Sequence, residues 1–225
     1  MASPDVEHPG ESHQTLAGSR GKGCHFPVIS FERYADDVIV HCKSEKQALW
    51  LKDVIARRLA QCHLELHPEK TKIVDCKDDD RTGNCLHESF DFLGFAFRPR
   101  GAKSRTGNHF VGFLPAISPK AGKAIRVTVR SWRLHRMSDK NLLDLSRMFN
   151  PIIRGWLNYY GSYYRSALYP LWDHLNRTLK RWAMRKFKRL RGRQRRAAHW
   201  LRRIKRQQPG LFAHWQLSSL PLAGR

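Results

Sequence analysis

The alternation of apolar and polar positions predicts a small mixed helix-and-sheet fold in the first part of the chain. Ser30–Arg33 and Val38–Cys42 have strand-like composition on either side of residues 34–37, which predicts a hairpin with two acids at its tip. A Ser-x-x-Gln capping signal at Ser44 opens a run of apolar residues at helical spacing. This run predicts a helix to about Gln61 that packs one face on the hairpin.

Further strands are expected before the middle of the chain. Residues 64–74 alternate around a Pro turn and predict two short strands. Phe90–Arg100 is rich in aromatic residues that are expected to bury on one sheet face, and Gly94 allows it to bend. A strand at His109–Leu114 would complete a second hairpin.

From Ser118 onward the apolar spacing becomes helical throughout. Ser118 followed by Pro119 is a strong helix start signal. Further helices are expected from Ser138 to Phe149, from Asn150-Pro151 onward, from about 171 to 190 and from about 195 to 206. The aromatic residues of 150–164 are expected to lie mostly in the core, and those off the apolar stripe could instead stack on nucleic-acid bases.

Charge separates the same two parts of the chain. Residues 1–119 carry 16 Lys and Arg against 16 Asp and Glu, whereas residues 120–225 carry 26 against 3, which is the whole net charge of +23. No acid follows Asp173, and apolar residues recur at helical spacing among the 14 basic residues from Lys180 to Arg206. A folded basic face of one sign predicts a polyanionic partner, because such a face repels itself unless it is neutralised.

Other compositional features restrict the class of protein. The five cysteines are odd in number and contain no Cys-x-x-Cys pair, so we expect neither a disulfide framework nor a zinc ribbon, and a reduced, cytoplasmic setting fits best. No stretch approaches the roughly 18 apolar residues of a membrane span, and no membrane partner is expected. Residues 1–25 are polar and lack the core of a signal peptide.

Two adjacent carboxylates at the hairpin tip are the candidate chemistry. At a tight turn, Asp36 and Asp37 can converge and share hard divalent cations through oxygen ligands. Two magnesium ions held there would clamp the attacking and leaving oxygens of a phosphoryl transfer. The alternative is a turn without chemistry, because Asp is an ordinary turn residue. Lys70 is a candidate for stabilising charge on a leaving pyrophosphate.

Four motifs in a fixed order resemble the C-terminal half of bacterial group II intron-encoded reverse transcriptase/maturases. They are Phe31 to Asp37, Leu66 to Lys72, Phe90 to Phe95 and Asn150 to Gly161, and the likeness runs from about Pro27 to Gln216. The resemblance implies an α+β fold, in which a partial polymerase palm of antiparallel sheet and helix precedes an all-α basic thumb or maturase domain. It also implies RNA-directed DNA polymerase chemistry, a nucleotidyl transfer, in a mobile element.

The resemblance assigns roles to individual residues. Asp36 and Asp37 would bind two Mg²⁺ ions, and Lys70 would be the functional lysine of a later palm motif. Tyr34 and Ala35, together with the primer grip Phe92-Leu93-Gly94, would contact nucleotide and primer. The residues expected to bind intron RNA and assist splicing are Arg154, Trp156, Asn158, Tyr159, Tyr160, Lys180, Arg181, Arg185, Lys186, Lys188 and Arg189.

The expected organisation is a disordered or non-homologous segment at 1–25, a partial palm at 26–117, a helical thumb at 118–207 and a tail at 208–225. The fingers and a third metal-binding Asp precede the Asp pair in that family, and only 33 residues precede Tyr34 here. We therefore expect an N-terminally truncated chain that binds RNA and does not polymerise alone, with a separate chain supplying the fingers and a DNA primer or target as a further partner. The alternatives are a stand-alone RNA-binding splicing factor with the palm as scaffold, and a non-functional remnant.

Overall fold

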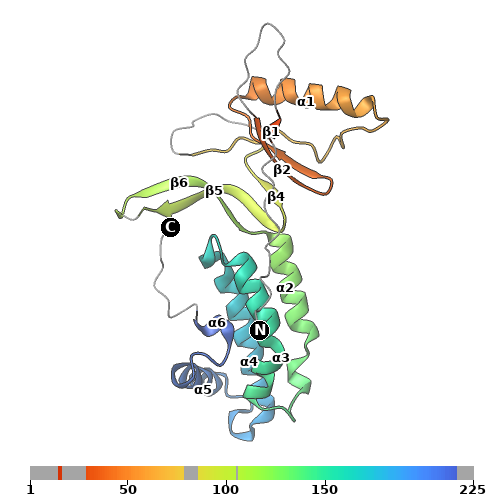
Figure 1. Cartoon of the computed structure of the whole chain (residues 1–225). Coiled ribbons are helices and arrows are strands. Elements are labelled where there is room, and N and C mark those ends of the chain that lie inside the picture. Colours follow the sequence, from red (N-terminus) through yellow and green to blue (C-terminus); the bar gives the residue numbers. More distant parts are fainter. Residues whose placement is uncertain (1–14, 17–28, 79–85, 105, 217–225) are drawn as a thin grey trace, which may run out of the picture. The chain divides into compact units, whose positions relative to one another are not determined.

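The computed structural model describes residues 15–16, 29–78, 86–104 and 106–216 (Figure 1). The chain forms two compact units, residues 1–73 and residues 74–225. Both combine helix with antiparallel sheet, which is compatible with the expected α+β class. Most of the segment 1–25 lies outside the described residues. No helix among those described is long and apolar enough to cross a lipid bilayer.

The sheet of the first unit confirms the expected hairpin. Its order is β1 (Thr15–Leu16), β2 (Ile29–Tyr34) and β3 (Asp37–Val40), and both pairings are antiparallel. Tyr34 lies opposite Asp37, so the connection between β2 and β3 has only two residues. A connection this short fixes the register of the ribbon.

Helix α1 (Glu45–Ala60) follows, and its capping signal is confirmed. The Ser44 Oγ accepts a hydrogen bond from the Gln47 amide at 3.3 Å, and the Gln47 side chain accepts one from the Lys43 amide at 2.7 Å. These bonds satisfy amides that a helix start otherwise leaves without partners. Gln47 is the only described residue of the first unit that is fully buried, and the apolar residues of α1 are half-buried at best.

The prediction of two strands over residues 64–74 is wrong. These residues form irregular chain with a turn at 68–70, where the Thr71 amide donates to the His67 carbonyl at 2.9 Å. Alternating polarity defines two faces, but a strand also needs a neighbour that accepts and donates its backbone hydrogen bonds. No such neighbour occurs among the described residues of the first unit.

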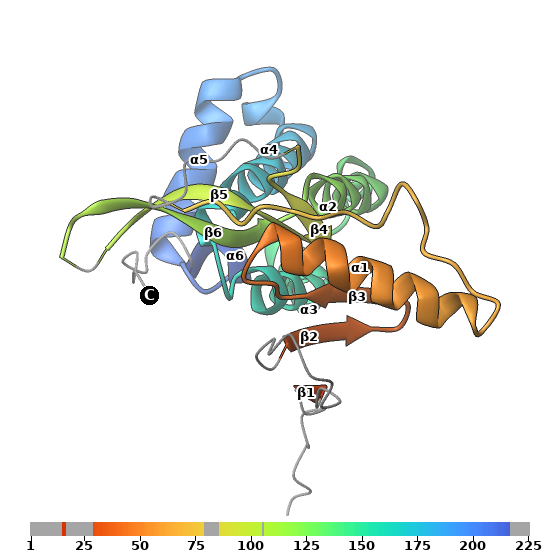
Figure 2. The same ribbon diagram turned by 90° about the horizontal axis from the view of Figure 1, so that it is seen from above.

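The second unit opens with a three-stranded antiparallel sheet of β4 (Phe90–Phe92), β5 (Phe95–Lys103) and β6 (His109–Ile117). Both hairpins were expected, although β6 extends further than predicted. Phe90 lies opposite Phe97, and their rings stack with centroids 4.8 Å apart. Figure 2 shows β5 and β6 as one long curved ribbon.

Helices make up the rest of the second unit (Figures 1 and 2). The expected start at Ser118 is confirmed, since its Oγ accepts a hydrogen bond from the Ala121 amide at 3.1 Å. The elements are α2 (Pro119–Ser131), η1 (Leu134–Arg136), α3 (Leu142–Tyr160), η2 (Arg165–Leu168), α4 (Tyr169–Lys186), η3 (Lys188–Leu190), α5 (Gln194–Gln207) and α6 (Ala213–Gln216).

The prediction of separate helices before and after Asn150-Pro151 is wrong, because α3 runs through both residues. The predicted start at Ser138 is also wrong, because the N-cap is Asn141, whose side chain and that of Asp144 form a capping box. A proline inside a helix removes one backbone hydrogen bond and costs about 3 kcal/mol. Asn150 is buried and uses its side chain elsewhere: its amide nitrogen donates to the Leu211 carbonyl at 2.9 Å, and its amide oxygen accepts from the Ala213 amide at 3.0 Å.

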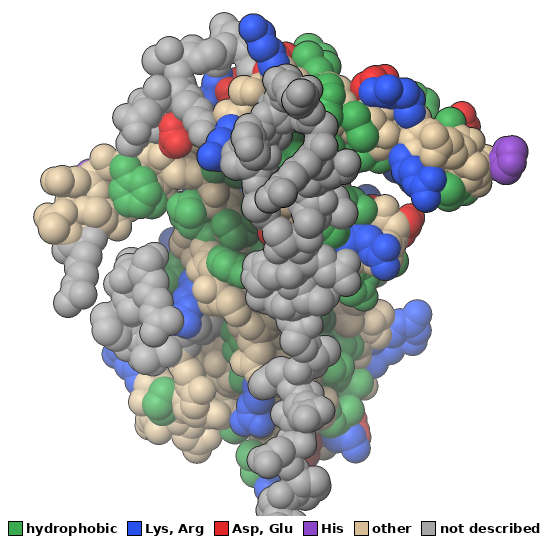
Figure 3. Space-filling view, turned by 45° about the horizontal axis from the view of Figure 1, so that its top comes forward, with side chains coloured by type: hydrophobic (Ala, Val, Ile, Leu, Met, Phe, Trp, Pro, Cys, Tyr) green, Lys and Arg blue, Asp and Glu red, His purple; other side chains and the backbone are tan. Residues whose placement is uncertain are grey.

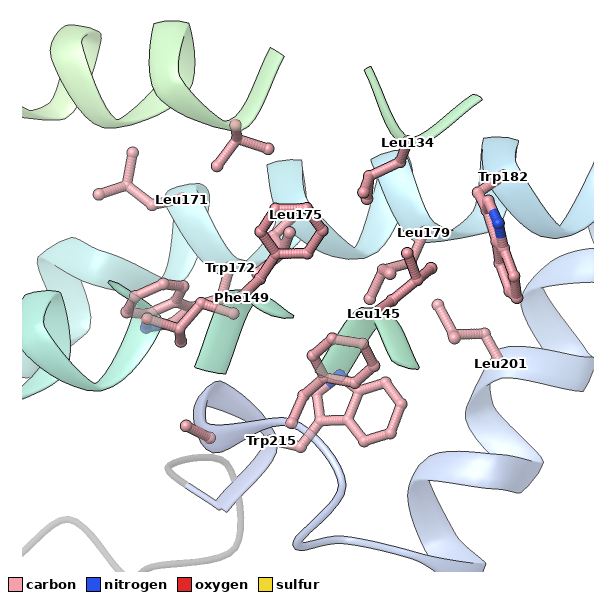
Figure 4. Close-up of a cluster of buried hydrophobic side chains, with 14 of the residues drawn as sticks. Leu134, Leu145, Phe149, Leu171, Trp172, Leu175, Leu179, Trp182, Leu201 and Trp215 are labelled. Atoms are coloured by element: carbon pink, nitrogen blue, oxygen red, sulfur yellow. The ribbon is translucent and has the colours of Figure 1, made fainter. Parts of the chain in front are cut away.

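The hydrophobic core of the second unit lies between these helices (Figure 4). Leu145, Leu175 and Leu179 are fully buried. Trp215 is also fully buried and donates through Nε1 to the Asn176 side chain at 2.9 Å. The part of 208–225 that the structure describes therefore packs into the core, although a tail was expected there.

Candidate functional site

The Asp36 and Asp37 carboxylates project from the β2–β3 turn, and both are exposed. The turn is unusual because Ala35 has a φ of +54°, which is left-handed backbone. A residue other than glycine in this region costs about 1–2 kcal/mol, and such strain gathers at functional sites. Because Asp37 lies directly opposite Tyr34, their side chains share one face of the ribbon.

The aspartates have the chemistry of a cation site without being a complete one. Neither makes an ion pair or a side-chain hydrogen bond with the described residues. Exposed carboxylate oxygens that lack a positively charged partner suit a hard divalent cation. In the described part of the chain, however, no group of three or more His, Cys, Asp or Glu side chains could hold a metal ion. The pair could supply only part of a coordination shell.

Lys70 is exposed in the turn at residues 68–70, after α1. Among the described residues it forms no ion pair or hydrogen bond with Asp36 or Asp37. Its ammonium is therefore available to an anion.

The turn between β4 and β5 consists of Leu93 and Gly94, with φ of +49° and +79°. Positive φ at both central residues is typical of two-residue hairpins whose twist matches the flanking strands, where Asn-Gly is the usual pair. Leu93 is therefore strained, and its side chain is exposed. The Ser118 amide donates to the Gly94 carbonyl at 2.9 Å, which ties the turn to the start of α2.

Tyrosines at the end of α3 and just after it hold this turn, and we call Tyr159, Tyr160 and Tyr163 the tyrosine clamp. The Tyr159 hydroxyl donates to the Leu93 carbonyl at 2.8 Å. All three rings pack around the Phe95 ring, with centroids 5.3 to 5.4 Å from it.

Tyr160 closes the clamp over Gly94. A Cβ added at Gly94 would lie 2.9 Å from the Tyr160 hydroxyl, which is closer than real Cβ contacts. Burial, with a smaller contribution from Tyr159, raises the pKa of Tyr160. Tyr159 and Tyr160 were expected to bind RNA, and their contacts with the hairpin were not predicted. In the sequence, the only feature that could have pointed to these contacts is Gly94 followed by the aromatic residue Phe95.

The other residues expected on the RNA-binding stretch of α3 fall into two groups. Arg154 and Asn158 are exposed. Trp156 is half-buried and stacks on Trp132 at 5.8 Å between centroids, in line with a stack of Trp132 on Phe149 at 4.1 Å. Part of the Trp156 side chain therefore packs against the hydrophobic core.

The basic residues of α4 and of η3, which follows it, also fall into two groups, those bonded within the chain and those that are exposed. Lys186 lies against the preceding segment, where its Nζ donates to the Ser138 and Lys140 carbonyls, each at 2.8 Å. Lys180 donates to the Gln194 side chain at 3.3 Å. The others, Arg181, Arg185, Lys188 and Arg189, are exposed. In the face that Figure 3 presents, Lys and Arg side chains reach the surface at many separate places.

Arg100 is a positively charged residue that was not predicted from the sequence. Its guanidinium donates to the Leu114 carbonyl at 3.1 Å and the Ala96 carbonyl at 3.2 Å, and lies 5.4 Å from the centre of the Tyr164 ring. Desolvation by burial, followed by the charge of Arg98, lowers its pKa. These contacts fix it on the β5–β6 ribbon beside the clamp.

Comparison with protein families gives two matches. The model described as reverse transcriptase (RNA-dependent DNA polymerase) matches residues 16–97, which include Asp36, Asp37, Lys70 and the Leu93-Gly94 turn. The model described as group II intron, maturase-specific domain matches residues 122–206, which include all the residues expected to bind RNA. Neither the curated proteins nor the solved structures gave a match.

Proposed function

Because this chain belongs to the group II intron reverse transcriptase/maturase family, we propose that its basic helical unit binds group II intron RNA and assists splicing. The observation that carries the proposal is the concentration of the whole net charge of +23 in residues 120–225, and the described helices of this segment enclose a hydrophobic core. A folded, one-signed surface of this kind favours a phosphate backbone over a protein partner of mixed charge.

The exposed basic side chains would carry most of the affinity. Arg154, Arg181 and Arg185 can each place two parallel N–H donors on one phosphate, and Lys188 and Arg189 add charge nearby. Asn158 would bond to sugar or base edges. The buried faces of Trp156, Tyr159 and Tyr160 would position the helix, and their exposed edges would contact RNA.

Reverse transcriptases use divalent metal ions, and we propose that Asp36 and Asp37 are ligands of Mg²⁺ in this chain. Two such ions would stabilise the attacking and leaving oxygens of a nucleotidyl transfer. Lys70 would balance charge on the departing pyrophosphate. Tyr34 and Ala35 would shape the floor beneath the nucleotide, and Phe92-Leu93-Gly94 would position the end of a DNA primer.

The first unit would need further sequence to act as a polymerase. Tyr34 is 63% exposed, Leu49 53% and Leu64 59%, and no described apolar side chain of this unit is fully buried. Among the described residues, this unit therefore has no closed apolar core, which suits a cover supplied by other sequence. We propose that fingers and additional palm sequence, on a separate chain, supply this cover and the third carboxylate. The chain alone then binds RNA but does not polymerise.

Salt dependence of RNA affinity tests the proposal. Replacing Lys188 and Arg189 with Gln should lower the log–log slope against salt by about 0.7–0.9 for each lost phosphate contact. Lys46 and Lys52, exposed on α1, are a matched pair for the control, because their replacement removes the same charge from the other unit. Equal slopes for the two altered chains would contradict RNA binding by the helical unit.

Primer extension tests the catalytic part. The chain with Mg²⁺, an RNA template and a DNA primer should give no extended product. If product forms, and is lost in Asp36→Asn but kept in Asp53→Asn, the chain contains a working site and the proposed need for a further chain is wrong. Splicing assistance that is unchanged in Asp36→Asn would favour a stand-alone splicing factor that uses the first unit only as a scaffold.

A further inference from the structure

An open hollow in the second unit lies where the end of α4 meets the start of α5. Its volume is about 490 Å³, within the roughly 300–1,000 Å³ range of small-ligand sites. We call it the arginine hollow. Its lining includes His135, Arg181, Met184, Arg185, Arg191 and Gln194.

Contacts between segments distant in sequence hold the walls of the hollow in place. Trp182 Nε1 donates to the Met137 carbonyl at 2.9 Å, and the Lys186 ammonium donates to two carbonyls of the segment that follows Met137. These bonds fix the last turns of α4 to the segment just after His135. On the other side, α5 is joined to α4 by the bond from Lys180 to Gln194. The backbone segments that carry the lining residues are therefore joined to one another by bonds within the chain.

The charge in the hollow has one sign. Arg181 and Arg185 are one turn apart on the same side of α4. Gly192 has a φ of +71°, a backbone bend that suits glycine, and Arg191 next to it lines the same hollow. All three arginines are exposed and make no ion pair with the described residues, and no acid is among the lining residues. Like charges placed together repel unless an anion joins them.

The remaining lining residues suit more than a bare phosphate. Met184 is half-buried and contributes an apolar wall, on which a flat base can pack. His135 and Gln194 offer hydrogen-bonding groups suited to a base edge. A base inside an RNA helix is stacked on its neighbours, whereas an unpaired base can be turned outward into a protein site.

We propose that the arginine hollow binds a single unpaired nucleotide of RNA. Its phosphate lies on the arginines and its base packs against Met184. The inference rests on the proposed RNA binding by the helical unit, and it adds a preference for RNA with an unpaired nucleotide over continuous duplex.

The test uses the full chain and two RNA hairpins of equal length, one with a single bulged 2-aminopurine and one fully paired. Binding to the bulged hairpin should be about tenfold tighter, the effect of burying about 60 Å² of apolar surface between the base and Met184, and should change the 2-aminopurine fluorescence. The double variant Arg181→Gln/Arg185→Gln should lose this preference. The matched variant Arg202→Gln/Arg203→Gln alters two exposed arginines outside the hollow, so it should lose affinity for both hairpins and keep the preference. Thermal melts check that both altered chains fold.

The outcomes separate the two proposals. If the unaltered chain binds both hairpins equally, the inference about the hollow is overturned and RNA binding stands. If Arg181→Gln/Arg185→Gln keeps the tenfold preference, the hollow is not the nucleotide site. If neither hairpin is bound, the proposed function itself fails.

Discussion

The contact of Gly94 with Tyr160 provides a quantitative test of the tyrosine clamp. Ala at position 94 would have to adopt a φ of +79°, which costs about 1–2 kcal/mol for a residue with a Cβ. The new methyl group would also lie 2.9 Å from the Tyr160 hydroxyl, and relieving such overpacking typically costs about 1–3 kcal/mol. Gly94→Ala should therefore lower the free energy of unfolding by about 2–5 kcal/mol, the sum of the two terms.

A double-mutant cycle separates the two contributions. The Tyr160 hydroxyl makes no hydrogen bond with the described residues, so Tyr160→Phe alone should change stability by less than about 0.5 kcal/mol. In the Tyr160→Phe background, the nearest remaining ring atoms are 3.5 Å or more from the added methyl group, which is ordinary contact. There, Gly94→Ala should cost only the backbone strain, so the coupling energy is the overpacking term of about 1–3 kcal/mol.

Urea unfolding followed by tryptophan fluorescence measures all four corners of the cycle. Gly101→Ala is the matched control on the same hairpin, because a Cβ there meets no atom within 4 Å and the φ of Gly101 is not left-handed. It should leave stability within about 1 kcal/mol of the unaltered chain. An equal cost of Gly94→Ala with and without Tyr160→Phe would show that Tyr160 does not close over the turn.

Three further predictions concern the same unit. Tyr159→Phe should cost about 1 kcal/mol through the lost bond to the Leu93 carbonyl, measured by urea unfolding, and Tyr163→Phe should cost nothing. Asn150→Ala should cost about 2–4 kcal/mol, since it leaves two backbone groups of residues 211–213 without partners; an unchanged urea midpoint would refute this role. Burial, then Lys205, lowers the pKa of His214 from 6.5 to about 3, so the folded state keeps it neutral while the unfolded state binds a proton below pH 6.5. Stability should therefore fall as the pH drops below 6.5, by up to about 1.4 kcal/mol per pH unit, and a urea midpoint that is constant from pH 7.5 to 4.5 would contradict this.

Much of the local structure could be predicted because its causes are local. The cap at Ser118, the two-residue turn after Tyr34 and the bend at Gly94 each depend on side chains and backbone within a few positions. The alternation over 64–74 predicts strands, and this prediction is wrong because a strand also depends on a neighbouring strand, which alternation does not provide.

The candidate site was predicted as a set of residues and not as an arrangement. The sequence identified Asp36 and Asp37 by type and order, and both lie at the expected hairpin tip. It assigned Tyr159 to RNA by its place in a motif, and only the structure shows that its hydroxyl lies on the Leu93 carbonyl, 66 positions away. Contacts between positions this far apart leave no periodic signal in either segment.

The sequence by itself determined the charge division, the caps at Ser44 and Ser118, the hairpins and the family, because these depend on composition, on near neighbours or on motif order. Tertiary structure alone decided that α3 continues through Pro151, where the burial of Asn150 against residues 211–213 offsets a locally unfavourable proline. It also decided that Tyr159 and Tyr160 of α3 hold the Leu93-Gly94 turn and that three arginines share one hollow. In each case the physical reason is the same: the stabilising partner comes from a distant segment, and only packing of the core brings it into contact.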